Sequence, residues 1–357
     1  ETGQGQFIRV KDFPEVSVHA SSLVAADFDQ DGDTDLFAGG LYQSQTYPLP
    51  EPNQILWNEG AGNFRLDTEL PFTRLRTSAA VAADIDGDGT TDLALAGEWE
   101  PVTIWSYASG IWTNKASSKP RGWYSSLQAA NLDADPAFEL VAGNWGHNSQ
   151  LQASKAQPIC LYHGDFDQNQ TIDPIMSYYV HNEAYPFVSR DDLLGQLPGL
   201  KKLFTSYHDY AAYTMADLLP SLPNAEVDSI TSLSTSVFDF TSAGLIETML
   251  PLEAQVAPVH AITSMDVNAD GREDLLLAGN NHYNRVKIGE VDANHGVLLM
   301  NRGSLQFEAA PNRTSGFQLK GDVRSVAQIG ENGRKYLFFG INNQPVQVYV
   351  LDDPDAL

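Results

Sequence analysis

One arrangement of apolar and polar residues recurs along this chain of 357 residues. A short run of small and apolar residues leads into an Asp-rich loop, which is followed by Asp-Leu, more apolar residues and Ala-Gly. The clearest copies span 23–39 and 81–97, a third spans 264–279, a weaker one spans 127–143, and a faint one at 325–340 has lost its acidic residues. The two apolar runs of each copy predict two short strands joined as a hairpin by the loop.

A second hairpin pattern follows most copies, as at 55–66, 102–112 and 297–308. Four antiparallel strands per repeat are typical of a propeller blade. The sequence therefore predicts an all-β fold, a single β-propeller of six or seven four-stranded blades that spans residues 1–357. Residues 6–10 match the pattern of a fourth strand, and we expect them to complete the C-terminal blade and so hide two sheet edges.

Residues 187–222 break the β pattern and predict a helical insertion. Ser189 is a suitable helix cap with Asp192 three residues further on, and Pro198 interrupts the helical run. The Asp-rich loop at Asp165 follows the one at Asn131 too closely for a new blade. We therefore interpret it as part of the second hairpin of the Asn131 blade.

Four of the loops carry acidic or amide side chains at positions 1, 3, 5 and 9. Oxygen ligands at alternating positions suit Ca²⁺, which takes six to eight oxygens. An EF-hand needs Glu at position 12, where these loops have Ala38, Leu95, Met176 and Leu277, so hairpin loops are expected instead. About four Ca²⁺ sites are predicted, with these candidate ligands: Asp27, Asp29, Asp31, Asp33, Asp35, Asp84, Asp86, Asp88, Asp92, Asp165, Asp167, Asn169, Asp173, Asp266, Asn268, Asp270 and Asp274.

The sequence leaves open whether the loop at Asn131 binds a metal. Asp133, Asp135 and Glu139 retain oxygens at the required positions, but Pro136 replaces the turn glycine. For any single loop, the alternative is a solvated Asp-Gly turn. Four loops at the same place in a repeat favour metal, because converging carboxylates without a cation repel one another.

The net charge of the chain limits the classes of partner that it is expected to bind. The chain has 21 Lys and Arg against 46 Asp and Glu, a formal net charge of -25. Such acidity argues against binding to nucleic acid and to anionic membrane surfaces. No apolar run approaches the roughly 18 to 20 residues of a membrane helix, so membrane insertion is not expected.

The Asp-rich loops, each followed by an apolar strand and mostly by Ala-Gly, resemble FG-GAP (VCBS) repeats. These are the repeats of integrin α-subunit propellers and of cartilage acidic protein. The stretch Gly-Asn-Trp-Gly-His-Asn at 143–148 and the insertion beginning at Tyr185 also resemble surface proteins of Bacteroidetes, often found near glycan-uptake systems. The resemblance implies a secreted or cell-surface protein that binds calcium and either binds a ligand or mediates adhesion.

The loops on the face opposite the calcium loops form a candidate ligand surface. Aromatic rings with amide and guanidinium donors suit sugars or ligands that carry carboxylates. The alternative is ordinary loop structure, with Asn and Gly turning the chain and Trp packing between blades. The candidate ligand-binding residues are Trp99, Arg121, Asn144, Trp145, His147, Asn280 and His282.

No catalytic motif of the nucleophile-elbow, zincin or phosphate-loop type is present, and the histidines have no metal-type spacing. No catalytic residue is therefore assigned. The preferred function is an extracellular module that binds a glycan or a protein. The alternative is a polysaccharide lyase or hydrolase on the same scaffold, because fold alone does not define activity.

Overall fold

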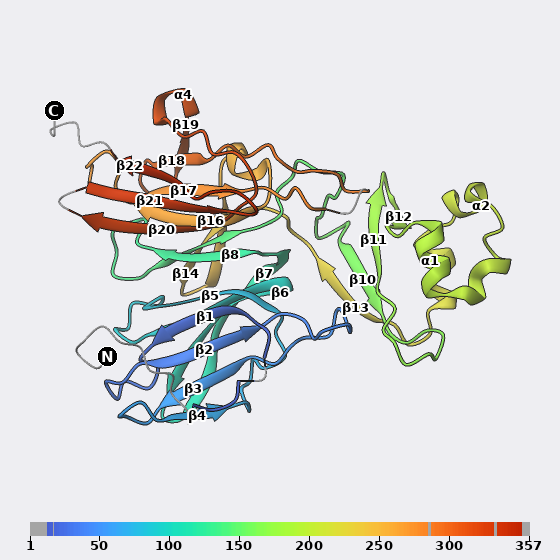
Figure 1. Cartoon of the computed structure of the whole chain (residues 1–357), viewed down its shortest axis with the longest axis horizontal. Helices are drawn as coiled ribbons and strands as arrows, with labels where there is room; N and C mark the ends of the chain where they lie inside the picture. Colours follow the sequence, from blue (N-terminus) through green and yellow to red (C-terminus); the bar gives the residue numbers. More distant parts are fainter. Residues whose placement is uncertain (1–12, 17, 285–286, 332–333, 352–357) are drawn as a thin grey trace.

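The computed structural model describes residues 13–351 except 17, 285–286 and 332–333. Its described strands form six antiparallel sheets, four of four strands and two of three (Figure 1). The predicted all-β class is thereby confirmed, whereas the closed propeller stays a prediction. The predicted strand at 6–10 lies outside the described residues.

Five sheets follow the order of the repeats. They consist of these strands: sheet 1, β1 (Ala20–Ala26), β2 (Asp35–Gly40), β3 (Gln54–Asn58) and β4 (Phe64–Asp67); sheet 2, β5 (Thr77–Ala83), β6 (Asp92–Ala108) and β7 (Ile111–Trp123); sheet 3, β8 (Ser126–Ala130), β9 (Glu139–Gly143), β14 (Ser236–Thr241) and β15 (Gly244–Met249); sheet 4, β16 (Val259–Met265), β17 (Asp274–Gly279), β18 (Val297–Asn301) and β19 (Phe307–Ala310); and sheet 5, β20 (Val323–Glu331), β21 (Arg334–Ile341) and β22 (Gln347–Leu351).

Sheets 1 to 5 pack face to face in the order of the chain. In Figure 1 sheet 1 lies at the bottom, and sheets 4 and 5 overlap in the upper part of the view. Successive residues of a strand point to opposite faces of the sheet. The second strand of an inner sheet is therefore buried on both faces. In β6, Leu93 and Leu95 pack against sheet 1, while Ala94 and Ala96 pack against sheet 3. The uninterrupted apolar run of the repeat is thus explained by burial on both sides.

The sixth sheet is an insertion within sheet 3. It contains β10 (Ile159–His163), β11 (Ile175–Val180), β12 (Glu183–Pro186) and β13 (Glu226–Ile230), and it lies between β9 and β14 in the chain. The interpretation of the Asp165 loop was therefore wrong. That loop joins β10 to β11 in the inserted sheet, and the second hairpin of the Asn131 blade is β14–β15.

Helices cover one side of the inserted sheet, on the right of Figure 1. The oxygen of Ser189 accepts the N–H of Asp192 and caps α1, as predicted. Among the described residues, no helix is long and apolar enough to cross a lipid bilayer. The helices here and elsewhere are α1 (Arg190–Gln196), η1 (Pro198–Lys202), α2 (Tyr207–Ala211), α3 (Met215–Leu218), η2 (Leu219–Ser221), η3 (Leu252–Gln255) and α4 (Asn312–Ser315).

A buried ionic network ties the insertion to sheet 2. The guanidinium of Arg76 binds both carboxylate oxygens of Asp228 on β13, at 2.5 and 2.7 Å, and its Nε donates to Glu100 at 2.9 Å. His163 of β10 lies 3.1 Å from the same Asp228 carboxylate. Burial alone would raise the pKa of Asp228, but the hydrogen bonds from Arg76 and His163 lower it.

Two candidate ligand-binding residues lie in strands. The segment 97–101 continues β6 as a bulge, where Trp99 takes φ 66° and the register with β7 shifts. Arg121 belongs to β7. In the faint copy at 325–340, the residues up to Glu331 form β20.

The Gly of the repeated Ala-Gly is required by close backbone contact. A Cβ at Gly97 would lie 1.6 Å from the carbonyl oxygen of Arg76, and one at Gly279 would lie 1.7 Å from that of Pro258. In both cases the carbonyl belongs to the residue just before the first strand of the same sheet. No side chain fits there unless the two strands move apart.

We predict that Gly279→Ala destabilises the protein by about 3 kcal/mol or more, because strand β17 must separate from the backbone before β16. Gly330→Ala is the matched control, since Gly330 is also in a strand but a Cβ there meets nothing within 4 Å. Urea unfolding of both variants measures the difference. Equal stability of the two variants would contradict this role for the repeat glycine.

Candidate metal centres

A buried acidic residue closes every Asp-rich loop. It is the first residue of the second strand of the hairpin or, for Asp173, lies two residues before that strand. Its carboxylate accepts the backbone N–H of the second loop residue. The donor and acceptor pairs are Phe28 and Asp35 (3.1 Å), Ile85 and Asp92 (3.1 Å), Phe166 and Asp173 (3.2 Å), Val267 and Asp274 (3.1 Å), and Leu132 and Glu139 (2.6 Å). Each loop is thereby folded around a carboxylate at its base.

The first Asp of each predicted calcium loop also accepts a backbone N–H, which belongs to the residue five positions later. These pairs are Asp27 with Gly32 (3.1 Å), Asp84 with Gly89 (2.9 Å), Asp165 with Gln170 (2.9 Å) and Asp266 with Gly271 (2.8 Å). The donors all have positive φ, between 69° and 94°. Glycine adopts this conformation without strain, which explains its use in three of the four loops.

The residue at position 5 shapes the turn. Its side-chain oxygen accepts the N–H two residues later, as Asp31 does from Asp33 (2.9 Å) and Asn169 does from Thr171 (2.8 Å). Asp and Asn favour such turns. The predicted ligands Asp31, Asp33 and Asp88 are not members of the carboxylate clusters described next.

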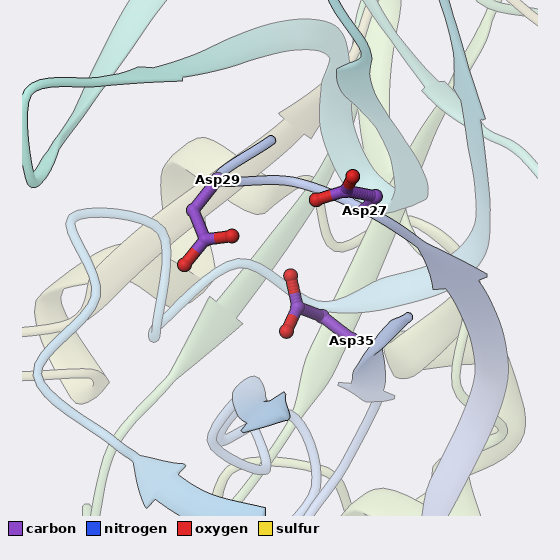
Figure 2. A group of neighbouring side chains, drawn as sticks. All are labelled: Asp27, Asp29 and Asp35. Atoms are coloured by element: carbon purple, nitrogen blue, oxygen red, sulfur yellow. The ribbon is translucent and has the colours of Figure 1, made fainter. Parts of the chain in front are cut away.

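Three of the four predicted loops bring three carboxylates together. In each, one oxygen from positions 1, 3 and 9 lies within 4.8 Å of the other two. Figure 2 shows the first cluster, in which the carboxylates of Asp27, Asp29 and Asp35 surround a common space. The other clusters are Asp84, Asp86 and Asp92, and Asp165, Asp167 and Asp173.

Two oxygens of these clusters are buried and have no hydrogen-bond partner in the part of the chain that the structure describes. They are Oδ1 of Asp27 and Oδ1 of Asp84, the first-position acids of the first two loops. A buried acceptor without a hydrogen bond costs roughly 1–3 kcal/mol, and more when it is charged. A divalent cation would satisfy both oxygens, so the residues present fit a bound metal.

The comparison with known families agrees with this geometry. Residues 27–95 match the family model of the FG-GAP-like repeat, from the first Asp-rich loop into β6. The chain contains an FG-GAP-type repeat. No curated protein matches the chain in sequence.

Burial changes the pKa of the carboxylate that closes each aspartate loop in the same direction. Desolvation raises the pKa of Asp35, Asp92 and Asp173 above the ordinary aspartate value, and the neighbouring loop acids raise it further. Backbone and hydroxyl hydrogen bonds offset only part of this effect. The ionised loops are therefore unfavourable by themselves, and a cation would remove the penalty.

The Asn131 loop also forms a cluster, made of Asp133, Asp135 and Glu139. The Asn131 amide is used inside the loop, because its nitrogen donates to the Asp135 carbonyl at 2.6 Å and its oxygen accepts the N–H of Ala134. Glu139 is 1% exposed, and burial raises its pKa to about 7.

The Asp266 loop has Asn268 at position 3, so positions 1, 3 and 9 offer two carboxylates and an amide in place of three carboxylates. Its predicted ligand set stays a prediction. The carboxylate of Asp270 at position 5 binds Arg272 at 2.6 Å and the Asn268 amide at 3.0 Å. A cation would have to compete with Arg272 there.

A lysine beside the second FG-GAP loop escaped the sequence analysis. The ammonium of Lys115 lies 2.6 Å from Asp86 and 3.6 Å from Asp88. Lys115 is on β7, far from the loop in sequence, and only the pairing of β7 with β6 brings it there. No local pattern could have indicated this contact.

Three of the predicted ligand-binding residues are structural. Trp99, Asn144 and Asn280 are at most 1% exposed. The Asn144 oxygen accepts the N–H groups of Trp123 and Trp145, and the Asn280 amide donates to two backbone carbonyls. This assignment is corrected, because their side chains are used inside the protein.

Three of the other four candidates are in contact with neighbouring side chains, and their role in ligand binding stays a prediction. Trp145 is 8% exposed and stacks on Trp123 with ring centroids 5.1 Å apart. Arg121 binds Glu100 at 3.0 Å, and His147 contacts Ser234 at 3.0 Å. The Nε2 of His282 is buried and has no hydrogen-bond partner among the described residues.

We predict that Glu139 makes the metal-free protein less stable as the pH rises. Its folded-state pKa of about 7 exceeds the ordinary value, so the folded state holds the proton more tightly. Stability is therefore greatest below the ordinary pKa and falls as the pH rises through 7. Between about pH 5 and pH 8, wild type should lose about 2 kcal/mol more than Glu139→Gln.

Urea unfolding in EDTA across this pH range measures the effect. Asp191→Asn is the control, since the Asp191 side chain is 63% exposed and belongs to no carboxylate cluster of the described residues. Identical pH dependence in wild type and Glu139→Gln would show that this buried carboxyl does not titrate as stated.

Proposed function

We propose that this chain is an extracellular calcium-binding module whose FG-GAP sheets form a propeller and which binds a glycan or an extracellular protein. The observation that carries the proposal is the pair of partnerless buried oxygens, Oδ1 of Asp27 and of Asp84, within carboxylate clusters. They occupy equivalent positions in adjacent sheets. A repeated ion site accounts for both.

The chemistry of the clusters supports calcium among the divalent ions. The three FG-GAP clusters consist of aspartates alone and contain neither His nor Cys. Hard oxygen ligands suit Ca²⁺, whereas imidazole and thiolate suit transition metals. Extracellular calcium modules bind at about 10⁻⁴ to 10⁻³ M, a range that partly exposed loops can serve.

A cation at these loops would stabilise the sheet as well as the turn. Asp35 opens β2, and its Oδ1 accepts the N–H of Asn58 on β3 at 2.8 Å. Asp274 makes the same contact with Asn301 on β18 at 2.8 Å. In sheet 1, a metal held by Asp35 would therefore be coupled to the third strand through one side chain.

The fold separates the metal loops of sheets 1 and 2 from a possible ligand end. In Figure 1 the arrows of β1, β8 and β20 point to the left, where the hairpin loops of the stacked sheets lie, and the insertion, which carries the Asp165 loop between β10 and β11, projects on the right. The proposed ligand surface includes the part of the insertion formed by β11, β12 and the helices. The net charge of -25 favours a partner other than nucleic acid.

We predict that calcium raises the melting temperature and that EDTA lowers it. Binding to the folded state at a hundredfold excess over Kd adds about 2.7 kcal/mol for each site. Asp84→Asn should weaken one site by about tenfold or more, because ligand charge tunes affinity. Its apo stability should change little, since the amide oxygen can still accept the Gly89 N–H.

Thermal melts and calorimetric calcium titrations of wild type, Asp84→Asn and the Asp191→Asn control measure these effects. The control removes the same charge from an exposed position on α1. A melting temperature indifferent to both calcium and EDTA would contradict the proposal, as would equal calcium binding by Asp84→Asn and wild type.

A further inference from the structure

The insertion carries a pocket that the calcium sites do not use. It has a volume of about 390 Å³ and lies between the β11–β12 hairpin and the segment from α2 to α3. Small-molecule sites typically have about 300 to 1,000 Å³. The pocket is lined by Tyr178, Val180, His181, Tyr185, Pro186, Tyr210, Ala211 and Tyr213.

The tyrosine rings are held in place from behind. The fully buried ring of Phe204 packs edge-on against Tyr210 and Tyr213, with centroids 5.2 and 4.7 Å apart. On the sheet side, Tyr178 packs edge-on against Phe187 at 5.3 Å. Rings fixed by packing lose little further freedom when a ligand binds.

Three of the four tyrosine hydroxyls are available to a ligand. Tyr210 donates its hydroxyl to the Val188 carbonyl at 2.7 Å. For Tyr178, Tyr185 and Tyr213, the described residues provide no hydrogen-bond partner, and these oxygens are not among the buried unsatisfied atoms. Each hydroxyl can donate one hydrogen bond and accept others.

The rim of the pocket includes the two-residue turn between β11 and β12. His181 takes φ 57° there, as the first position of such hairpin turns requires. The Gln157 amide holds this turn by donating to the His181 carbonyl and to the Asn182 side chain, both at 3.1 Å. This part of the rim is therefore fixed by hydrogen bonds before a ligand binds.

The lining offers a ligand no carboxylate, ammonium or guanidinium group. Among the described residues, it contains no Asp, Glu, Lys or Arg. The nearby ammonium of Lys287 donates to the Phe187 carbonyl and lies 4.2 Å from that ring centroid and 5.8 Å from the ring centroid of Tyr178. This lining favours a ligand that presents apolar surface to the rings and neutral polar groups to the hydroxyls.

We propose that this tyrosine pocket binds a residue of a neutral saccharide. A pyranose ring has an apolar face that stacks on aromatic rings and an edge of hydroxyls that pair with tyrosine hydroxyls. The inference rests on the proposed function, since it places a glycan subsite on the proposed ligand end. The residues of this pocket differ from the candidate ligand-binding residues that the sequence predicted.

The test uses malto-, cello-, xylo- and mannohexaose as neutral probes and hexagalacturonic acid as the anionic comparison. Binding is measured with calcium present, by calorimetry and by saturation-transfer NMR. At least one neutral hexaose should bind better than the acid. Tyr185→Ala and Tyr213→Ala should each weaken it by about tenfold, the scale of one aromatic contact.

Two further variants make the test specific. Tyr207→Ala is the matched control, because Tyr207 is 65% exposed on α2 but is absent from the pocket lining. It should bind the hexaose like wild type. Tyr213→Phe keeps the ring and its packing, so it should bind more weakly than wild type and more tightly than Tyr213→Ala.

Three results would overturn the inference: no binding of any neutral hexaose, preference for the acid, or unchanged binding by Tyr185→Ala and Tyr213→Ala. Calcium-dependent melting of the same samples separates this failure from that of the proposed function. Normal calcium stabilisation without saccharide binding rejects the pocket alone, whereas absent calcium stabilisation rejects the module.

Discussion

The first hairpin of each acidic repeat depends on negative charge held at its turn. Asp35 and Asp92 are at most 1% exposed, yet each lies within 4.8 Å of two other carboxylates. Two unit charges 4 Å apart repel by about 4 kcal/mol at an effective dielectric of 20. Backbone N–H groups relieve part of this repulsion, and the partnerless oxygens of Asp27 and Asp84 show that part remains. In our account, a divalent cation supplies the rest.

Because the sheets are stacked, the order of each acidic loop also affects the packing between neighbouring sheets. In the inner sheets 2 and 3, the acidic loop is followed by a strand that is buried on both faces, β6 or β9, so a disordered turn would disturb two sheet interfaces. At the C-terminal end of the stack, the outer face of sheet 5 is apolar and about half exposed, at 58% for Val346, 52% for Val348 and 49% for Val350. The proposed propeller would cover this face on closing.

The repeats, the loop ligands at positions 1 and 9 and the Ser189 cap were predictable, because neighbouring residues in the sequence determine them. Strand partners were not. The Asp165 loop has the same local pattern as the others, and only the pairing of β10 with β11 and β13 assigns it to the inserted sheet. The sequence of Asn144 is the same whether its amide binds a ligand or the backbone. Only its burial in the structure shows that the amide binds the backbone. The partner of Asp270, Arg272, is only two residues away, but the sequence alone did not indicate that their side chains pair.

The central claim is that the FG-GAP loops hold calcium, and counting the bound ions tests it most directly. Native mass spectrometry of the chelator-treated protein, before and after equilibration with calcium, gives this number. We expect uptake of at least three ions, one for each aspartate cluster of the FG-GAP loops. A mass that stays that of the bare chain at millimolar calcium would contradict the account.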